Sequence, residues 1–159
     1  MKKLDFVLWV LVLTCFVFSS FSLAQNSYSG MSMGTPMQMY TKDVIVEGIN
    51  VTFQIMNNEE HQKMLSDMKM KVDIEQGTTH NITVLLKDVK TQQEVINAQI
   101  TMKVIDPKGQ DQIKPLKYDA AMKSYDAYFK LSDKGRYQVL ILFKVGEQKR
   151  TAGIYYEIK

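Results

Sequence analysis

Residues 127–145 read AYFKLSDKGRYQVLILFKV, and this stretch decides the fold. Apolar and polar side chains alternate up to Leu131, and a second run rich in β-branched and aromatic residues follows from Tyr137 to Val145. Alternation with a period of two is the pattern of a strand with one buried face. The intervening Ser132–Gly135 contains Ser, Asp and Gly, which favour tight turns. The stretch therefore predicts two antiparallel strands joined by a turn.

The turn and the tyrosine after it form a second signal. Asp133, Gly135 and Tyr137 fall where the tyrosine corner of immunoglobulin-like sandwiches has them. In that motif the tyrosine hydroxyl bonds back to the turn before its strand. The alternative is that Tyr137 is an ordinary aromatic residue of a strand. We favour the corner.

Further strand patterns recur from residue 44 to the end of the chain. They are separated by turns such as residues 106–109, where a proline and a glycine suit a reversal of direction. We therefore expect an all-β fold, an immunoglobulin-like antiparallel β-sandwich of about seven strands, over residues 43–159. The other strand patterns lie at residues 44–56, 79–86, 98–104 and 154–158.

One segment, residues 57–72, interrupts this pattern. It is rich in Glu, Lys, Gln and Met and has no β-branched residue before its last position. Asn57 or Asn58 could cap a helix, and Glu59 and Glu60 suit a first helical turn. The sequence predicts a short Met-rich helix or a structured loop inserted into the sandwich.

The N-terminus has the pattern of a secretory signal peptide. Lys2 and Lys3 precede an apolar run over residues 6–18, and small residues lead to Ala24. We expect residues 1–24 to be removed and the protein to be exported to the periplasm or cell envelope. The alternative is an uncleaved membrane anchor, but the run is shorter than the roughly 20 apolar residues that a spanning helix needs.

Residues 25–42 contain Ser, Gly, Gln and Pro with few large apolar groups, so we expect a flexible Met-containing leader. The leader methionines are then either metal ligands or inert, and we favour ligands. They are Met31, Met33, Met37 and Met39.

Composition excludes several classes of function. The chain has 20 Lys and Arg against 17 Asp and Glu, with a net charge of +3 and no basic block, which argues against nucleic-acid binding. The single cysteine, Cys15, leaves with the signal peptide, so the exported chain has no thiol nucleophile. Glycine-rich phosphate loops, paired-His metalloprotease spacing and the G-x-S-x-G elbow are also absent. We expect a non-enzymatic protein without an organic cofactor.

Methionine is the unusual component, with 11 residues. A thioether is a soft, neutral donor, so methionines clustered with imidazoles suit Cu(I) or Ag(I) better than Zn or Mg. Helical spacing places His61, Met64 and Met68 on one face, and His80 begins a strand at the rim of the predicted sandwich. The alternative is packing, because methionine readily fills gaps in a core. For the helix methionines both alternatives stay open, whereas we favour packing for Met56 and Met102.

Several motifs together resemble the exported bacterial YtkA-like domains, which are immunoglobulin-like sandwiches reminiscent of CopC-type periplasmic copper-binding proteins. The resemblance covers residues 43–159 and rests on residues 57–64, 68–70, 77–82, 104–109 and 133–137. It implies an exported sandwich with a His/Met metal region. The residues that match this region are His61, Met64, Met68, Met70, His80 and Met122.

The sequence thus predicts a periplasmic protein that binds or hands on Cu(I) or Ag(I) through Met and His side chains. The alternative is an accessory module that docks another envelope protein without metal, since exposed methionines suit adaptable contacts. If metal is bound, we expect His61 and His80 to converge with methionine sulfurs at the rim. Sulfurs in the core would favour the docking module.

Overall fold

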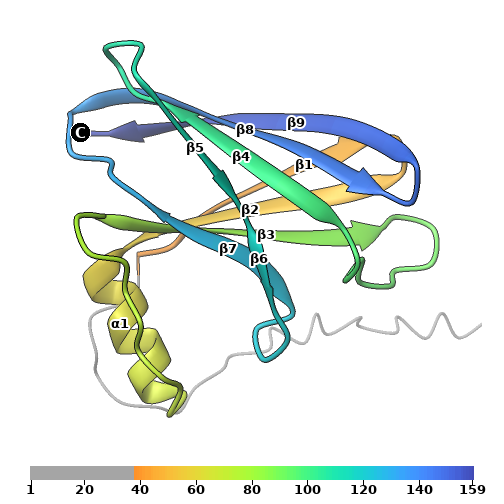
Figure 1. Ribbon diagram of the computed structural model, residues 1–159, viewed down its shortest axis with the longest axis horizontal. Coiled ribbons are helices and arrows are strands. Elements are labelled where there is room, and N and C mark those ends of the chain that lie inside the picture. Colours follow the sequence, from red (N-terminus) through yellow and green to blue (C-terminus); the bar gives the residue numbers. More distant parts are fainter. Residues whose placement is uncertain (1–37) are drawn as a thin grey trace, which may run out of the picture. The chain divides into compact units, whose positions relative to one another are not determined.

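The structure, a computed structural model, describes residues 38–159. Two antiparallel sheets form a β-sandwich, which confirms the predicted all-β, immunoglobulin-like fold (Figure 1). One sheet has the strand order β1-β2-β3-β7-β6 and the other the order β5-β4-β8-β9. The strands are β1 (Tyr40–Val46), β2 (Ile49–Asn57), β3 (His80–Asp88), β4 (Gln99–Ile105), β5 (Asp111–Pro115), β6 (Lys117–Asp119), β7 (Ser124–Phe129), β8 (Gly135–Val145) and β9 (Gln148–Ile158).

The predicted signal peptide, residues 1–24, and the leader up to residue 37 lie outside the described residues. The first strand, β1, begins at Tyr40, within the segment expected to be the leader and before the domain start expected at residue 43. No helix within residues 38–159 has the length and apolarity that crossing a bilayer requires.

The core lies between the two sheets, where every second residue of the central strands points inward. Phe53 in β2, Val84 in β3, Met102 in β4 and Phe143 in β8 are all 0% exposed. Burying one such side chain contributes about 1.5–3 kcal/mol, so these alternating faces provide most of the stability of the fold. Met102 is a core residue, as we expected.

The tyrosine corner is formed. The Tyr137 hydroxyl donates to the Asp133 carbonyl oxygen at 2.9 Å and accepts from the Asp133 backbone N–H at 2.8 Å. Gly135 between them has a φ of 124°, a region that side chains rarely adopt. The two bonds fix the turn before β8 against the core.

The sandwich has nine strands in the described residues, not about seven. The additional strands, β5 and β6, are short and polar, and their sequences lack a clear run of apolar alternation. The chain crosses from one sheet to the other between them, at Leu116, whose backbone N–H donates to the Ile100 carbonyl oxygen at 2.9 Å. Pro115 ends β5 at the sheet edge, where a missing N–H costs no ladder bond.

The predicted insertion is a helix, α1 (Asn58–Asp67), that packs against the sheet containing β2 and β3 (Figure 1). The Asn57 side-chain oxygen accepts the Glu60 backbone N–H at 2.8 Å, so the predicted cap is confirmed. The buried face of α1 carries His61 and Leu65, while Met68 follows the helix and is 50% exposed. The helix is therefore turned so that one histidine faces the sheet.

Candidate functional site

A cavity of about 160 Å³ lies where α1 covers the outer face of the sheet, and we call it the His61 cavity. Strand alternation builds its floor, because Asn81 lies opposite Tyr128 and Thr83 lies opposite Asp126 on neighbouring β3 and β7. These side chains point away from the core. The cavity is lined by His61, Leu65, Met70, Lys71, Asp73, Thr83, Asp119, Met122, Ser124, Asp126 and Tyr128.

Met70 reaches this cavity because the end of α1 reverses the chain. Lys69 has a φ of 56°, and its N–H bonds to the Ser66 carbonyl oxygen at 3.0 Å. The Met70 N–H bonds to the Leu65 carbonyl oxygen at 2.8 Å. This pair of bonds is the Schellman motif, which brings the second residue after the cap back against the last helical turn. Met70 and Leu65 consequently line the same cavity.

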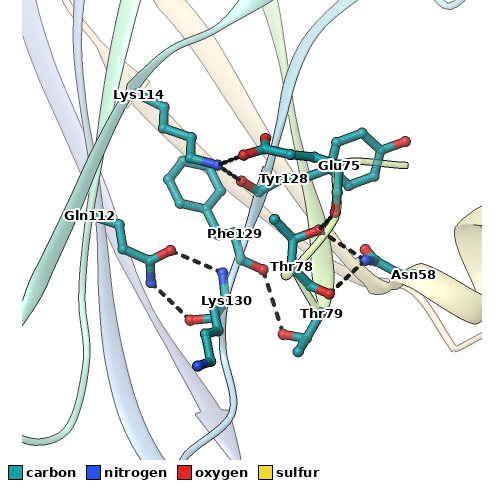
Figure 2. Close-up of polar contacts among 9 residues, drawn as sticks. All are labelled: Asn58, Glu75, Thr78, Thr79, Gln112, Lys114, Tyr128, Phe129 and Lys130. Atoms are coloured by element: carbon teal, nitrogen blue, oxygen red, sulfur yellow. Dashed lines mark hydrogen bonds and ion pairs between the residues drawn. The ribbon is translucent and has the colours of Figure 1, made fainter. Parts of the chain in front are cut away.

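The loop between α1 and β3 is held in place by contacts to β5 and β7 (Figure 2). The Lys114 ammonium donates to the Glu75 carboxylate and to the Tyr128 carbonyl oxygen, each at 2.7 Å. The Asn58 side-chain amide donates to the Thr78 carbonyl oxygen at 3.0 Å. Lys114 joins the loop to β5 through Glu75, and the Asn58–Thr78 bond joins it to the start of α1, so the part of the loop that precedes β3 is fixed on two sides.

Met122 comes from the turn between β6 and β7. The Asp119 carboxylate accepts the backbone N–H groups of Ala121 at 2.7 Å and Met122 at 3.1 Å. Such a capped turn holds its backbone in one conformation. Three separate segments, α1, the loop after it and this turn, therefore supply His61, Met70 and Met122 to one cavity.

The imidazole of His61 is positioned by a neighbouring phenol. His61 is 5% exposed, and its Nδ1 lies 3.0 Å from the Tyr128 hydroxyl. That contact leaves Nε2 as the nitrogen available to an ion, the arrangement commonly found for metal-binding histidines. Beside it, the Asn81 side-chain amide donates to the Asp126 carboxylate at 3.0 Å, and the Thr83 hydroxyl donates to Asn81 at 2.8 Å.

Burial shapes the charges in the cavity. It lowers the pKa of His61, and the nearby Asp126 carboxylate opposes that shift. Burial also raises the pKa of Asp126, against the Asn81 hydrogen bond and the attraction of the His61 ring. Desolvation, together with Asp126 and Asp73, raises the pKa of Tyr128 to about 12. A neutral imidazole and a protonated phenol therefore stand beside a partly buried carboxyl group.

His80 does not join His61. It lies on the inner side of β3, at the end of the sandwich, and lines a separate cavity of about 410 Å³ that we call the His80 cavity. Met64 and Met68 are among the lining residues of neither cavity. Of the six residues predicted for the metal site, the structure brings together His61, Met70 and Met122 only.

Three of the donors in the His61 cavity suit a soft ion, namely the His61 imidazole and the Met70 and Met122 thioethers. No three His, Cys, Asp or Glu side chains gather into a group that could hold a metal ion within residues 38–159. Zn and Mg prefer such groups, whereas one imidazole with two thioethers is a donor set for Cu(I) or Ag(I). The imidazole and the two thioethers fit a soft monovalent ion, and the carboxyl groups of Asp73, Asp119 and Asp126 line the same cavity as hard donors.

Sequence reasoning missed the polar residues that support this cavity, Asn81, Asp126 and Tyr128. The usable signal was the alternation itself, because Asp126 and Tyr128 alternate with the apolar Ala127 and Phe129 on β7. Asn81 is 1% exposed although it points away from the core, which shows that α1 covers this outer face. A sheet surface that is both polar and covered is where a site can form.

Comparison with protein-family models finds no match, and no curated protein matches the sequence. Several solved structures are similar in fold. FetP of uropathogenic Escherichia coli strain F11, expressed in the periplasm and examined as isolated, has a TM-score of 0.57 and 11% identity over 76% of this chain and 96% of its own. A copper-bound variant of FetP gives a TM-score of 0.57, 11% identity and coverage of 76% and 97%.

The third is a DUF4426 family protein of Pseudomonas aeruginosa PAO1, with a TM-score of 0.54 and 17% identity over 74% of this chain and 94% of its own. At these identities the similarity establishes a shared β-sandwich fold, and it covers nearly the whole length of the chain in each of the three structures.

Proposed function

We propose that this chain is an exported, non-enzymatic protein that binds or hands on a soft monovalent ion, Cu(I) or Ag(I). The observation that carries the proposal is that His61, Met70 and Met122 line one cavity. They come from three separate segments of the chain, so their meeting is a product of the fold and not of sequence proximity.

The chemistry of the cavity favours a monovalent ion. Thioethers carry no proton and no charge, so they bind a soft ion at any pH at which the protein is folded. Asp126, whose carboxyl group is costly to ionise when buried, stands beside the imidazole and would be stabilised as a carboxylate by a cation. Tyr128 would hold the His61 ring through Nδ1, with Nε2 bound to the ion.

The comparisons support the proposal at the level of fold. One similar structure is copper-bound, and FetP was expressed in the periplasm. A periplasmic location also agrees with the signal peptide expected at residues 1–24. We keep the YtkA-like domain as the proposed family, since its sequence motifs and a copper-binding sandwich point to the same kind of protein.

The test is a Cu(I) titration against a competing chelator, under reducing and oxygen-free conditions. Protein expressed with its own export segment is purified from the periplasm and stripped of metal. We expect one Cu(I) per chain in the wild type, and at least tenfold weaker binding in the double variant Met70→Leu/Met122→Leu. Met64→Leu/Met68→Leu is the matched control, because it removes two nearby thioethers that line neither cavity.

The proposal is wrong if the wild type takes up no Cu(I), or if both double variants bind as tightly as the wild type. Ag(I), which is not readily oxidised or reduced in buffer, should give the same ranking of variants. Circular dichroism and urea unfolding confirm that each variant is folded before its affinity is compared.

The second candidate, a docking module without metal, is favoured by one observation. Ile113, Leu142 and Tyr155 on the outer face of the four-stranded sheet are 60%, 47% and 53% exposed. Exposed apolar side chains on a sheet surface suit contact with another protein. A folded wild type that binds neither Cu(I) nor Ag(I) would favour this function.

A further inference from the structure

A groove of about 570 Å³ adjoins the His61 cavity. The groove and the cavity share Asp73, Asp126 and Tyr128 among their lining residues. Asp126 and Tyr128 belong to β7, whereas Asp73 belongs to the loop between α1 and β3, so this loop forms the wall between the two spaces. His61 is 5% exposed, and a solute therefore reaches its ring freely only if part of the wall moves.

The loop is anchored at both ends but is free between them. At its start the Met70 N–H donates to the Leu65 carbonyl oxygen at 2.8 Å, and near its end the Asn58 side-chain amide donates to the Thr78 carbonyl oxygen at 3.0 Å. The backbone of residues 71–74 forms no hydrogen bond to another backbone group within residues 38–159. Three of these four residues are exposed. Such a segment opens at low cost in a folded protein.

One side-chain contact holds this free segment against the sandwich. The Lys114 ammonium donates to the Glu75 carboxylate and to the Tyr128 carbonyl oxygen, each at 2.7 Å (Figure 2). The same ammonium lies 5.5 Å from the centroid of the Phe129 ring. Lys114 is therefore fixed on β7, and Glu75 is the loop residue that it holds. The Glu75 side chain is 53% exposed, and an ion pair of this exposure is weak enough to break while the protein stays folded.

We propose that the Glu75–Lys114 contact is a latch, and that its release lets residues 71–75 move away from the sheet and join the groove to the His61 cavity. The two anchors remain in place, so the movement is confined to these residues. The ion proposed for the cavity would enter and leave by this opening, and that part rests on the proposed function. The latch itself concerns access to His61 with or without metal.

The first test measures how fast diethylpyrocarbonate modifies His61, by mass spectrometry of the full protein purified from the periplasm and stripped of metal. The reagent acylates neutral imidazoles, and the half-buried His80 is the reference within the same chain. We expect the His61 rate to rise about threefold in Glu75→Ala and about tenfold in Lys114→Met, which removes both bonds of the ammonium. The His80 rate should not change.

The matched control is Glu147→Ala, which removes the partner of Lys144 in the turn between β8 and β9 and should leave the His61 rate as in the wild type. The double variant Glu75→Ala/Lys114→Met should react no faster than Lys114→Met alone, because both substitutions break the same contact. Urea unfolding shows that each variant is folded. Where Lys114→Met fails to fold, Glu75→Ala decides, since Glu75 is exposed.

The latch is overturned if the folded variants of Glu75 and Lys114 leave the His61 rate unchanged. It is also overturned if His61 and His80 accelerate equally, because that result would report a loosening of the whole fold.

The second test follows the transfer of bound Ag(I) to a competing chelator by stopped-flow. We expect the latch variants to release the ion faster, by factors similar to those for His61 modification. Unchanged release from a variant whose His61 has become accessible would overturn the passage of the ion through this opening. A wild type that binds neither Ag(I) nor Cu(I) would overturn the proposed function, and the ion passage with it, whereas the modification of His61 still decides the latch.

Discussion

The two histidines occupy opposite kinds of surroundings. His61 is 5% exposed beneath α1, bonded to a phenol and accompanied by two thioether residues. His80 lies at the open end of the sandwich, bonded to the Thr79 hydroxyl and accompanied by a carboxylate. The same side chain is therefore enclosed once beneath a helix and presented once at the open end of the sandwich.

Strand geometry is the reason for the separation. Successive residues of a strand point to opposite faces, so His80 and Asn81 cannot share a side of the sheet. Asn81 lies opposite Tyr128, whose hydroxyl bonds to His61, and this pair belongs to the outer face that α1 covers. A single site containing both rings would require a register that differs by one residue, which would also expose the core.

The largest difference that we predict between the cavities is in stability. His61→Ala should lower the free energy of unfolding by about 2–3 kcal/mol, because it empties a buried volume and leaves the Tyr128 hydroxyl without its partner. His80→Ala should cost about 1 kcal/mol, since His80 is only half-buried and Thr79 keeps its backbone partners. Urea unfolding of the metal-free variants measures both values.

Equal losses in the two variants would contradict this contrast, because they would mean that the enclosure of His61 contributes nothing. A larger loss for His80→Ala would place the structurally important imidazole at the end of the sandwich. Gln at each position is the control for volume, as it keeps a polar side chain of similar length.

Much of the fold could be predicted because it depends on local chemistry. Alternation in residues 127–145 predicted strands, and Asp133, Gly135 and Tyr137 predicted a corner whose two hydrogen bonds are present. The helix cap at Asn57 was predicted for the same reason, since a side-chain oxygen and a backbone N–H three residues away suffice. Each of these features is contained in a few neighbouring residues.

The arrangement of the site could be predicted only in part. Alternation already placed His80 on the same side of its strand as Ile82 and Val84, but nothing local determines which face of the sheet α1 covers. The reversal that delivers Met70 was hidden because Lys69 stands where glycine usually marks such a turn. Met122 was carried over from the family resemblance, and the structure places it beside His61.

The stability of the protein as a function of pH should depend on the protonation of the His61 and His80 rings. Burial lowers both pKa values below the ordinary 6.5, so the unfolded chain binds more protons than the folded one as the pH falls through that value. Stability is then lost as the pH falls below about 6.5, by at most about 1.4 kcal/mol per pH unit for each ring. His61→Gln and His80→Gln should each remove part of this slope.

Asp126 contributes with the opposite sign and needs its own control. Burial raises its pKa, so the folded state holds a proton more readily and its contribution to stability falls as the pH rises. The histidine variants are therefore compared in an Asp126→Asn background, by urea unfolding at several values between pH 5.5 and 8. A slope below pH 6.5 that survives in the double histidine variant would contradict the assignment to these rings.

The smallest effect concerns Lys69, whose position matters to the His61 cavity alone. Its φ of 56° costs a residue with a Cβ atom about 1–2 kcal/mol. Glycine adopts this φ freely, but its greater conformational entropy in the unfolded chain lowers the free energy of unfolding by about 0.4–1 kcal/mol. Lys69→Gly should therefore raise the free energy of unfolding by about 0.5 kcal/mol and leave Cu(I) binding unchanged. Lys63→Gly, in the exposed middle of α1, should instead lower it by about 1 kcal/mol. If both substitutions destabilise the protein equally, Lys69 is not in the left-handed conformation that turns Met70 toward His61, and the soft donor set loses the local structure that assembles it.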